Sequence, residues 1–279
     1  MVIKEVLTDL SGRLKKYGNK NAVMEANMIL RHFLKLEPID LILLKDKELR
    51  GIDIENIYTA LERRIKHEPL QYILGVQEFM GLEFNVNKNV LVPRADTETL
   101  VEYLLNKYMN RGFRALDIGT GSGCIAISLA HFNKNAFVRG IDISEGAIET
   151  AKENAEKNNV DERVVFCLAD IFKSVIYGQY DVIVSNPPYI ESETVKSLDR
   201  DVKDYEPIGA LDGGGDGLKY YRHIVKIAPS MLLKGGMLAF EVGYNQAEKV
   251  SELMKKDFND IEIVKDLCGV NRVVAGRIN

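Results

Sequence analysis

The sequence predicts a Rossmann-like α/β fold that follows a small helical domain. Three observations predict it: apolar residues recur with helical spacing through residues 1–75, strands and helices alternate from residue 114 onward, and a glycine-rich turn follows the first of those strands. Such alternation is typical of a mostly parallel sheet with helices on both faces, whose ligands bind beyond the carboxyl ends of the strands. We expect a helical domain at 1–75, a β-hairpin linker at 76–93 and a ligand-binding domain at 94–279.

The composition favours an ordinary globular protein. Of 279 residues, 46% are hydrophobic and 28% are charged, which is enough apolar material for a sizeable core. The formal net charge is −4, so the totals show no basic excess of the kind that proteins bound to duplex DNA usually carry. The three cysteines form no Cys-x-x-Cys pair, which argues against disulfides and metal sites. With no signal pattern and no bilayer-spanning apolar run, we expect a cytoplasmic protein without membrane contact, and we expect a monomer.

The first 75 residues contain three apolar stripes at helical spacing. The stripes are Val6, Leu7, Leu10 and Leu14; then Ala22, Ala26, Ile29, Leu30, Phe33 and Leu34; then Ile54, Ile57, Leu61 and Ile65. Packing among a few short helices explains them, and Asp53 stands where a cap for the third helix is expected. Acidic and basic residues are balanced here, so we interpret this part as a protein-docking or lid domain rather than a nucleic-acid clamp.

The next stretch predicts a β-hairpin, because residues 76–92 alternate between apolar and polar side chains and contain a turn signal at Asn87-Lys88-Asn89. Pro93 ends that strand, and a helix is expected over 97–109. The alternation that follows has strands at 115–118, 136–143, 164–168, 180–185, 237–242, 261–264 and 272–277, and helices at 124–131, 144–158, 218–233 and 246–258.

The first strand of the alternation runs into a glycine-rich turn with the candidate cofactor-binding residues Asp117, Gly119, Thr120, Gly121, Ser122 and Gly123. Glycines allow tight turning and close approach of the backbone to a ligand, and the following helix offers free N–H groups at its start. A plain strand–helix turn has the same pattern. Asp142 ends the next strand about 20 residues later, where a carboxylate accepts from ribose hydroxyls. Capping of the helix that begins near Ser144 is the alternative.

The spacing of the turn favours a cofactor without phosphate. Dinucleotide-binding loops read Gly-x-Gly-x-x-Gly, with room for a pyrophosphate, whereas this loop reads Gly-x-Gly-x-Gly. Acceptors around Asp117 and Gly119 suit the ammonium group of S-adenosylmethionine. Asp170 ends the third strand, where it or the Ile171 backbone is placed to hold the adenine amino edge, although an ordinary loop aspartate has the same pattern. We predict S-adenosylmethionine as cofactor, with a dinucleotide-dependent dehydrogenase as the alternative.

The most specific stretch joins a buried strand to Asn186-Pro187-Pro188-Tyr189. The prolines stiffen the backbone after Asn186, so its side-chain oxygen and the Pro187 carbonyl can both accept from one –NH₂ group, while Tyr189 offers a flat face to a planar group. A rigid strand-end turn is the alternative, which the glycine-rich loop in the same sheet disfavours. We predict Asn186, Pro187 and Tyr189 as catalytic residues, the whole tetrapeptide including Pro188 as substrate-binding, and Asn186 as a cofactor contact as well.

The chemistry that this motif suits is methyl transfer to a planar nitrogen. An amide nitrogen is a poor nucleophile because its lone pair is delocalised. Two acceptors on its hydrogens fix its orientation and favour the positive charge that develops as a methyl group arrives, and in-line placement supplies most of the remaining help. No strong base is required, and the four histidines show no ligand or triad spacing, so we interpret them as surface or packing residues.

The chain resembles the bacterial release factor glutamine methyltransferases, the HemK/PrmC family, along nearly its full length. The resemblance lies in Glu68–Gly75, Val92-Pro93-Arg94, Thr97-Glu98, the loop 117–123, Asn186–Tyr189, Glu206-Pro207, Ala210-Leu211, residues 213–218, Asp266-Leu267, Gly269 and Arg272. Where the family usually has Pro-Arg-Pro-Glu-Thr-Glu, residues 93–98 read Pro-Arg-Ala-Asp-Thr-Glu. Some members have Trp where this chain has Ile171, so we expect an aromatic contact to adenine to be missing.

The resemblance implies a class I S-adenosylmethionine methyltransferase fold, with seven strands of which the last is antiparallel, and a helical domain that docks a protein substrate. It implies methyl transfer to the side-chain nitrogen (N5) of the Gln in the Gly-Gly-Gln loop of class 1 peptide-chain release factors, which act in translation termination, with S-adenosylhomocysteine as product. From the residues alone the acceptor is only a planar nitrogen. An adenine-N6 DNA or other nucleic-acid amine methyltransferase and a cofactor-bound scaffold without catalysis are the alternatives.

Overall fold

The computed structural model describes residues 1–109 and 111–278, which form two compact units. One unit comprises Met1–Gly75 and Arg200–Tyr205, and the other comprises Val76–Asp199 and Glu206–Asn279. The chain therefore passes between the units three times. In contrast to the expected division, residues 200–205 join the helical unit, and the hairpin belongs to the second unit.

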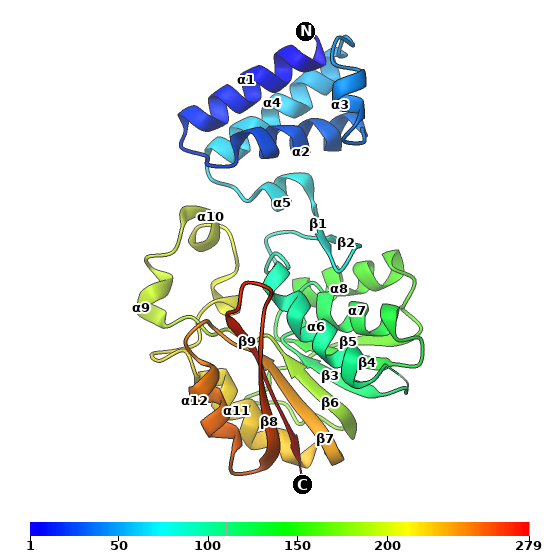
Figure 1. Cartoon of the computed structure of the whole chain (residues 1–279), viewed down its shortest axis with the longest axis vertical. Helices are drawn as coiled ribbons and strands as arrows, with labels where there is room; N and C mark the ends of the chain where they lie inside the picture. The colour runs from blue at the N-terminus through cyan, green and yellow to red at the C-terminus, as the bar shows by residue number, and fades with distance from the viewer. Residues whose placement is uncertain (110, 279) are drawn as a thin grey trace. The chain divides into compact units, whose positions relative to one another are not determined.

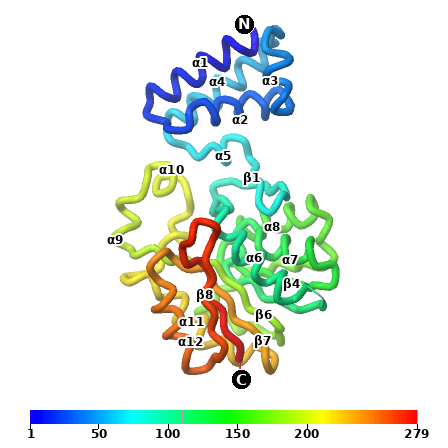
Figure 2. Tube along the Cα trace, in the orientation of Figure 1, coloured from blue at the N-terminus to red at the C-terminus, as the bar shows by residue number. Residues whose placement is uncertain are grey.

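Short helices build the first unit (Figure 1). They are α1 (Ile3–Lys16), α2 (Ala22–Leu34), α3 (Asp40–Leu43), α4 (Gly51–Ile65), α5 (Leu70–Leu74) and α10 (Arg200–Lys203). Figure 2 traces α1, α2 and α4 side by side, and their inward faces share one core that includes Leu10, Ile29 and Leu61. These three side chains are 0% exposed, and burial of each contributes about 2 kcal/mol before the entropy cost of folding. The predicted stripes therefore mark the packed faces.

The start of α4 differs from the prediction. Arg50 precedes the helix at the N-cap position, and Asp53 lies inside the first turn, so the prediction that Asp53 caps the helix was wrong. Its carboxylate instead accepts two hydrogen bonds from the Arg50 guanidinium, at 2.7 and 2.8 Å. An acidic residue in the first turn still favours the helix electrostatically.

The hairpin consists of β1 (Val76–Phe79) and β2 (Leu82–Asn85), which pair antiparallel. Its turn is Met80-Gly81, with φ of 55° and 72°, the two positive values that a tight primed turn requires. The prediction that Asn87-Lys88-Asn89 makes the hairpin turn was wrong, because those residues follow β2. There Asn87 makes a separate turn, in which its carbonyl accepts from Val90 N at 3.1 Å.

The described part of the second unit contains a seven-stranded sheet (Figure 1). Its strands are β3 (Arg114–Ile118), β4 (Phe137–Asp142), β5 (Val164–Leu168), β6 (Tyr180–Ser185), β7 (Leu232–Glu241), β8 (Phe258–Lys265) and β9 (Asn271–Ile278). Their order is β5-β4-β3-β6-β7-β9-β8, in which β9 runs antiparallel to both of its neighbours. The predicted Rossmann-like sheet with an antiparallel last strand is therefore confirmed.

Helices cover both faces of this sheet (Figure 1). On one face lie α6 (Ala95–Lys107), α7 (Cys124–Phe132) and α8 (Glu145–Lys157), and on the other lie α11 (Lys219–Ile227) and α12 (Ala247–Met254). Alternate strand residues supply the two cores: Val182 and Val184 pack toward the first set of helices, and Ile183 packs toward the second. This alternation follows from the pleat of a strand.

Between β6 and β7 the chain departs from the predicted elements. The short helices α9 (Ser192–Val195) and η1 (Ile208–Ala210) span too few residues to produce a periodic pattern. The predicted helix at 218–233 is too long: α11 ends at Ile227, Pro229 lies in the 3₁₀ turn η2 (Ala228–Ser230), and β7 begins at Leu232. Proline lacks the N–H that would continue the helix. Among the described residues no helix is long and apolar enough to cross a bilayer.

Candidate cofactor and methyl-acceptor site

A cavity of about 210 Å³ lies at the carboxyl ends of the parallel strands in the second unit. The register explains its position, because Ile118 pairs with Ile141 on one side and with Ser185 on the other, so these strands end at the same level. The Ser185 hydroxyl donates to the Ile118 carbonyl at 2.7 Å and ties the two central strand ends together. Ligands of such sheets bind at this edge.

The cavity brings together most, but not all, of the predicted site residues. Those that line it are Gly119, Gly121, Asp142, Asp170, Ile171, Asn186, Pro187 and Pro188. Those that do not are Asp117, Thr120, Ser122, Gly123 and Tyr189. The glycine-rich loop and the Asn-Pro-Pro segment therefore form walls of one cavity although 65 or more residues separate them in the sequence.

The glycine-rich loop folds back on the next strand. Gly119 N and Thr120 N donate to the Ile141 carbonyl at 2.9 and 3.0 Å, and Gly121 N donates to the Asp142 carboxylate at 3.0 Å. Gly119 and Gly121 have φ of 74° and 56°, which glycine adopts without the strain that a Cβ would impose. The loop thus presents bare backbone to the cavity.

Asp117 supports this loop from behind. Its side chain is 0% exposed, and its Oδ2 accepts from the Thr120 hydroxyl at 2.6 Å. Its Oδ1 has no hydrogen-bond partner within residues 1–109 and 111–278. Burial raises the pKa of this carboxyl to about 7. Asp117 therefore supports the glycine-rich loop and does not itself line the cavity.

Asp142 lies in the cavity wall and connects the glycine-rich loop to the start of α8. Its two carboxylate oxygens accept from Ser144 N at 2.9 Å and from Gly121 N at 3.0 Å. The cap of α8 is Ser144 itself, whose hydroxyl accepts from Ala147 N at 3.2 Å. Each carboxylate oxygen can accept more than one hydrogen bond, so Asp142 keeps capacity for ribose hydroxyls at the cavity wall.

The loop after β5 closes another side of the cavity. The Asp170 carboxylate accepts from Phe172 N at 2.9 Å, and this N–H is the main reason that the pKa of Asp170 is lowered. The His223 ring holds the Ile171 carbonyl at 2.7 Å. Phe172 and Tyr220 also line the cavity, with ring centroids 5.5 Å apart. These aromatic residues, which the sequence reasoning missed, lie where an aromatic contact beside Ile171 was expected to be missing.

The Asn-Pro-Pro-Tyr segment is held from several directions. Asn186 Nδ2 donates to the Thr97 hydroxyl at 3.2 Å, and the Gln246 amide donates to the Tyr189 carbonyl at 2.9 Å. A Cβ at Gly213 would lie 2.7 Å from Tyr189 Cα, so that close approach requires glycine. The Tyr189 ring packs beside Gly243, and burial raises the pKa of its hydroxyl to about 12. Tyr189 is thus a neutral packing residue outside the cavity wall.

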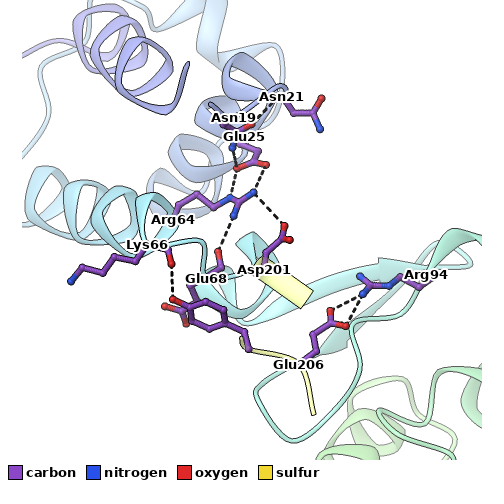
Figure 3. A network of polar contacts seen from close by, with 10 residues as sticks. Asn19, Asn21, Glu25, Arg64, Lys66, Glu68, Arg94, Asp201 and Glu206 are labelled. Carbon is purple, nitrogen blue, oxygen red and sulfur yellow. Dashed lines mark hydrogen bonds and ion pairs between the residues drawn. The ribbon is translucent and has the colours of Figure 1, made fainter. Parts of the chain in front are cut away.

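Two further segments line the cavity, and the residue patterns in the sequence did not predict them as part of the site. They are Asn89–Leu91, before α6, and Pro207, Gly209 and Ala210, after the α10 segment. Arg94 joins them, because its Nη2 lies 2.7 and 2.8 Å from the two oxygens of Glu206, which is 4% exposed (Figure 3). The signal for these segments in the sequence is that Val92–Arg94, Glu206-Pro207 and Ala210-Leu211 belong to the family resemblance.

The helical unit contains its own buried polar network (Figure 3). Arg64 Nε lies 2.6 Å from Glu25 Oε2, and the two side chains are 13% and 10% exposed. The same guanidinium lies 3.8 Å from Asp201, and the Tyr205 hydroxyl donates to the Lys66 carbonyl at 2.8 Å. These contacts bind residues 200–205 to the helices. Within the described residues no cluster of three His, Cys, Asp or Glu side chains suited to a metal ion is found.

Known proteins match the chain over both units. The family model described as the PrmC N-terminal domain matches residues 5–75, and a methyltransferase domain model matches residues 109–273. A release factor glutamine methyltransferase of Geobacter sulfurreducens is 43% identical, covering 99% of this chain and 96% of the relative. One from Clostridium botulinum is 37% identical, covering 99% of both. A methyltransferase structure from Pyrococcus furiosus has a TM-score of 0.53 at 21% identity, covering 82% of this chain and 98% of that one, which shows a shared fold.

Proposed function

The chain belongs to the release factor glutamine methyltransferase family, and we propose that it transfers a methyl group from S-adenosylmethionine to the side-chain amide nitrogen of the Gln in the Gly-Gly-Gln loop of class 1 release factors. The observation that carries this proposal is that Asn186 and Pro187 line the same cavity as Gly119, Gly121 and Asp142. One cavity therefore offers a cofactor loop and acceptors for a planar –NH₂ group.

The residues of the cavity fit S-adenosylmethionine better than a dinucleotide. The carboxylates of Asp142 and Asp170 line the wall, where they would repel the phosphates of a dinucleotide but accept from ribose hydroxyls and an adenine amino group. Phe172 and Tyr220 supply aromatic surface for a purine. When bound, the cofactor supplies an electrophilic methyl group on a cationic sulfur. The protein's own contribution is to hold the cofactor, to orient the acceptor amide and to exclude water from both.

Asn186 and Pro187 would prepare the acceptor nitrogen. The Asn186 side-chain oxygen and the Pro187 carbonyl accept the two hydrogens of the amide, which fixes its plane and favours the positive charge that develops on nitrogen. The pKa of Tyr189 is raised to about 12, so this residue stays protonated and does not serve as a base near neutral pH. The proton can leave after transfer, because the methylated amide cation is strongly acidic.

We propose the helical unit as the part that docks the release factor. The PrmC N-terminal domain model matches residues 5–75 of that unit, which supports a role for it that is separate from catalysis. Its exposed apolar side chains Ile39, Ile42 and Leu43, each more than half exposed, offer a surface for a protein partner.

Mass spectrometry of a release factor after incubation with the protein and S-adenosylmethionine tests this function. We expect a single added methyl group on the Gly-Gly-Gln glutamine, and no labelling of adenine-containing DNA under the same conditions. Asn186→Ala removes one of two acceptors, so we expect kcat to fall about 100-fold or more. Labelled DNA with an unmodified release factor, or an Asn186→Ala variant with full activity, would contradict the proposal.

A further inference from the structure

A buried carboxyl group stands next to Asn186 in the sheet. Glu241 ends β7, and its side chain is 1% exposed. In the register of β6 and β7, Ser185 pairs with Phe240, so Asn186 and Glu241 follow at the same level. Phe240 packs toward α11 and α12, and the alternation of a strand therefore turns Glu241 toward the opposite face, where α6 lies. The Glu241 side chain is absent from the cavity wall.

Among the described residues no ion pair compensates the burial of this carboxyl group. Its Oε2 makes no hydrogen bond within the described part of the chain. The two charged groups that affect its pKa, Asp96 and Arg272, pair with each other at 2.7 Å. A buried acid in this state costs stability. Its presence beside Asn186 is therefore better explained by the site than by the fold.

Thr97 connects Glu241 to Asn186. The threonine lies in the first turn of α6 and is 2% exposed, and its hydroxyl accepts from Asn186 Nδ2 at 3.2 Å. A hydroxyl has one proton to donate, and a buried one needs an acceptor for it. Burial raises the pKa of Glu241 to about 7, whereas hydrogen bonds from Thr97 and Asn186 act to lower it. Donation to the charged carboxylate has that effect.

The direction of these hydrogen bonds determines which end of the Asn186 amide faces the cavity. A charged carboxylate only accepts, so Thr97 and the Asn186 –NH₂ both donate toward Glu241, and Thr97 turns a lone pair toward Asn186 Nδ2. The Asn186 oxygen then points away from Thr97. If the amide were rotated by half a turn, its –NH₂ would face the –NH₂ of the acceptor, and two donors cannot bond each other.

We propose that Glu241 is a positioning residue for methyl transfer, which together with the Thr97 hydroxyl holds the Asn186 amide with its oxygen toward the acceptor nitrogen. This inference rests on the proposed function, because it assigns Asn186 the role of acceptor there. Glu241 itself touches neither the cavity nor a reacting atom.

Steady-state kinetics with a release factor substrate tests the role of Glu241, at about pH 8.5, where the carboxylate is charged. We expect Glu241→Gln to lower kcat about tenfold while the KM for release factor and the Kd for S-adenosylhomocysteine stay within about threefold. Thr97→Val is expected to have the same effect, and Thr97→Ser, which keeps the hydroxyl, to retain nearly full kcat. Because the two residues hold the same Asn186 amide, the double variant should lose about tenfold, not about 100-fold. Glu102→Gln, an exposed position on the same helix, is the matched control.

Wild-type kcat in Glu241→Gln or in Thr97→Val overturns the proposal. A double variant whose loss of kcat equals the product of the two single losses also overturns it, as does an effect on KM alone. If Glu241→Gln does not fold, the comparison of Thr97→Val with Thr97→Ser decides, and equal kcat values for the two overturn it. A wild-type protein that methylates no release factor overturns the proposed function itself. An active wild type with unaffected variants overturns only the role of Glu241.

Discussion

At the scale of single residues, Asp117 shows how a buried acid links the site to the stability of the fold. Burial raises its pKa to about 7 from the ordinary value of 3.8. Below about pH 3 the carboxyl is protonated whether the chain is folded or not. As the pH rises toward 7 the unfolded chain loses this proton first, so folding becomes less favourable, and above about pH 7 the penalty stays constant.

The Asp117→Asn variant isolates this penalty. We expect wild-type protein to lose about 2 kcal/mol of unfolding free energy relative to the variant between about pH 5 and pH 8, because the variant has no carboxyl to ionise. Urea titrations of both proteins at the two pH values measure the difference. The exposed Asp161→Asn variant is the control. If the unfolding free energies of wild type and Asp117→Asn differ by the same amount at both pH values, the buried carboxyl does not have the raised pKa stated above.

The residues of the site divide into those that a strand end places and those that tertiary neighbours place. Asn186 and Asp142 could be predicted, because each directly follows or ends a recognisable buried strand. The packing of Tyr189 beside Gly243 and the contribution of Tyr220 could not, since each depends on a residue from a distant segment. Glu241 has no local pattern at all, and only the register of two strands brings it to Asn186.

At the scale of elements, the glycine-rich loop packs closely against β4 because Gly140 has no side chain. A Cβ there would lie 2.5 Å from Phe166 Cδ1 and 2.7 Å from the Thr120 hydroxyl oxygen. The same hydroxyl donates to Asp117, so the space at Gly140 lets the loop rest against the strand. Close packing of this kind leaves little room for even one methyl group.

Gly140→Ala should therefore affect both the fold and the site. We expect a loss of about 2 kcal/mol in unfolding free energy and weaker binding of S-adenosylhomocysteine, because Phe166 and Thr120 must move. Chemical denaturation and titration calorimetry measure the two effects. Gly215→Ala, at a position with no heavy atom within 4 Å of the added Cβ, is the matched control. Unchanged values for Gly140→Ala would mean that the loop adapts freely.

The elements that could be predicted are those longer than one period of their pattern. Strands β3 to β6 and helices α7 and α8 lie within about two residues of their expected bounds. The hairpin turn was misplaced because Asn87-Lys88-Asn89 has stronger turn chemistry than Met80-Gly81, although the latter makes the reversal. Short helices such as α9 leave no periodic signal.

At the scale of the whole molecule, each of the two units is built from two separate stretches of the sequence. The change of pattern near Gly75 marks one boundary, but residues 200–205 join the helical unit through side chains that no local pattern reveals. The next residues, Glu206 onward, return to the second unit, where Pro207 and Gly209 line the cavity. Residues 200–210 thus belong first to the helical unit and then to the unit that contains the cavity.

Arg64 is the residue on which this arrangement depends in the helical unit, because its guanidinium pairs with Glu25 at 2.6 Å and faces Asp201 at 3.8 Å. Arg64→Ala leaves the Glu25 carboxylate, whose side chain is 10% exposed, without its cation, so we expect a loss of about 3 kcal/mol in that unit. Hydrogen exchange should then be about 100-fold faster in α2 and in residues 200–205, while β3 and β6 keep their protection. Lys4→Ala breaks an ion pair whose side chains are 57% and 62% exposed and should change little. Uniform acceleration across both units would show instead that they unfold together.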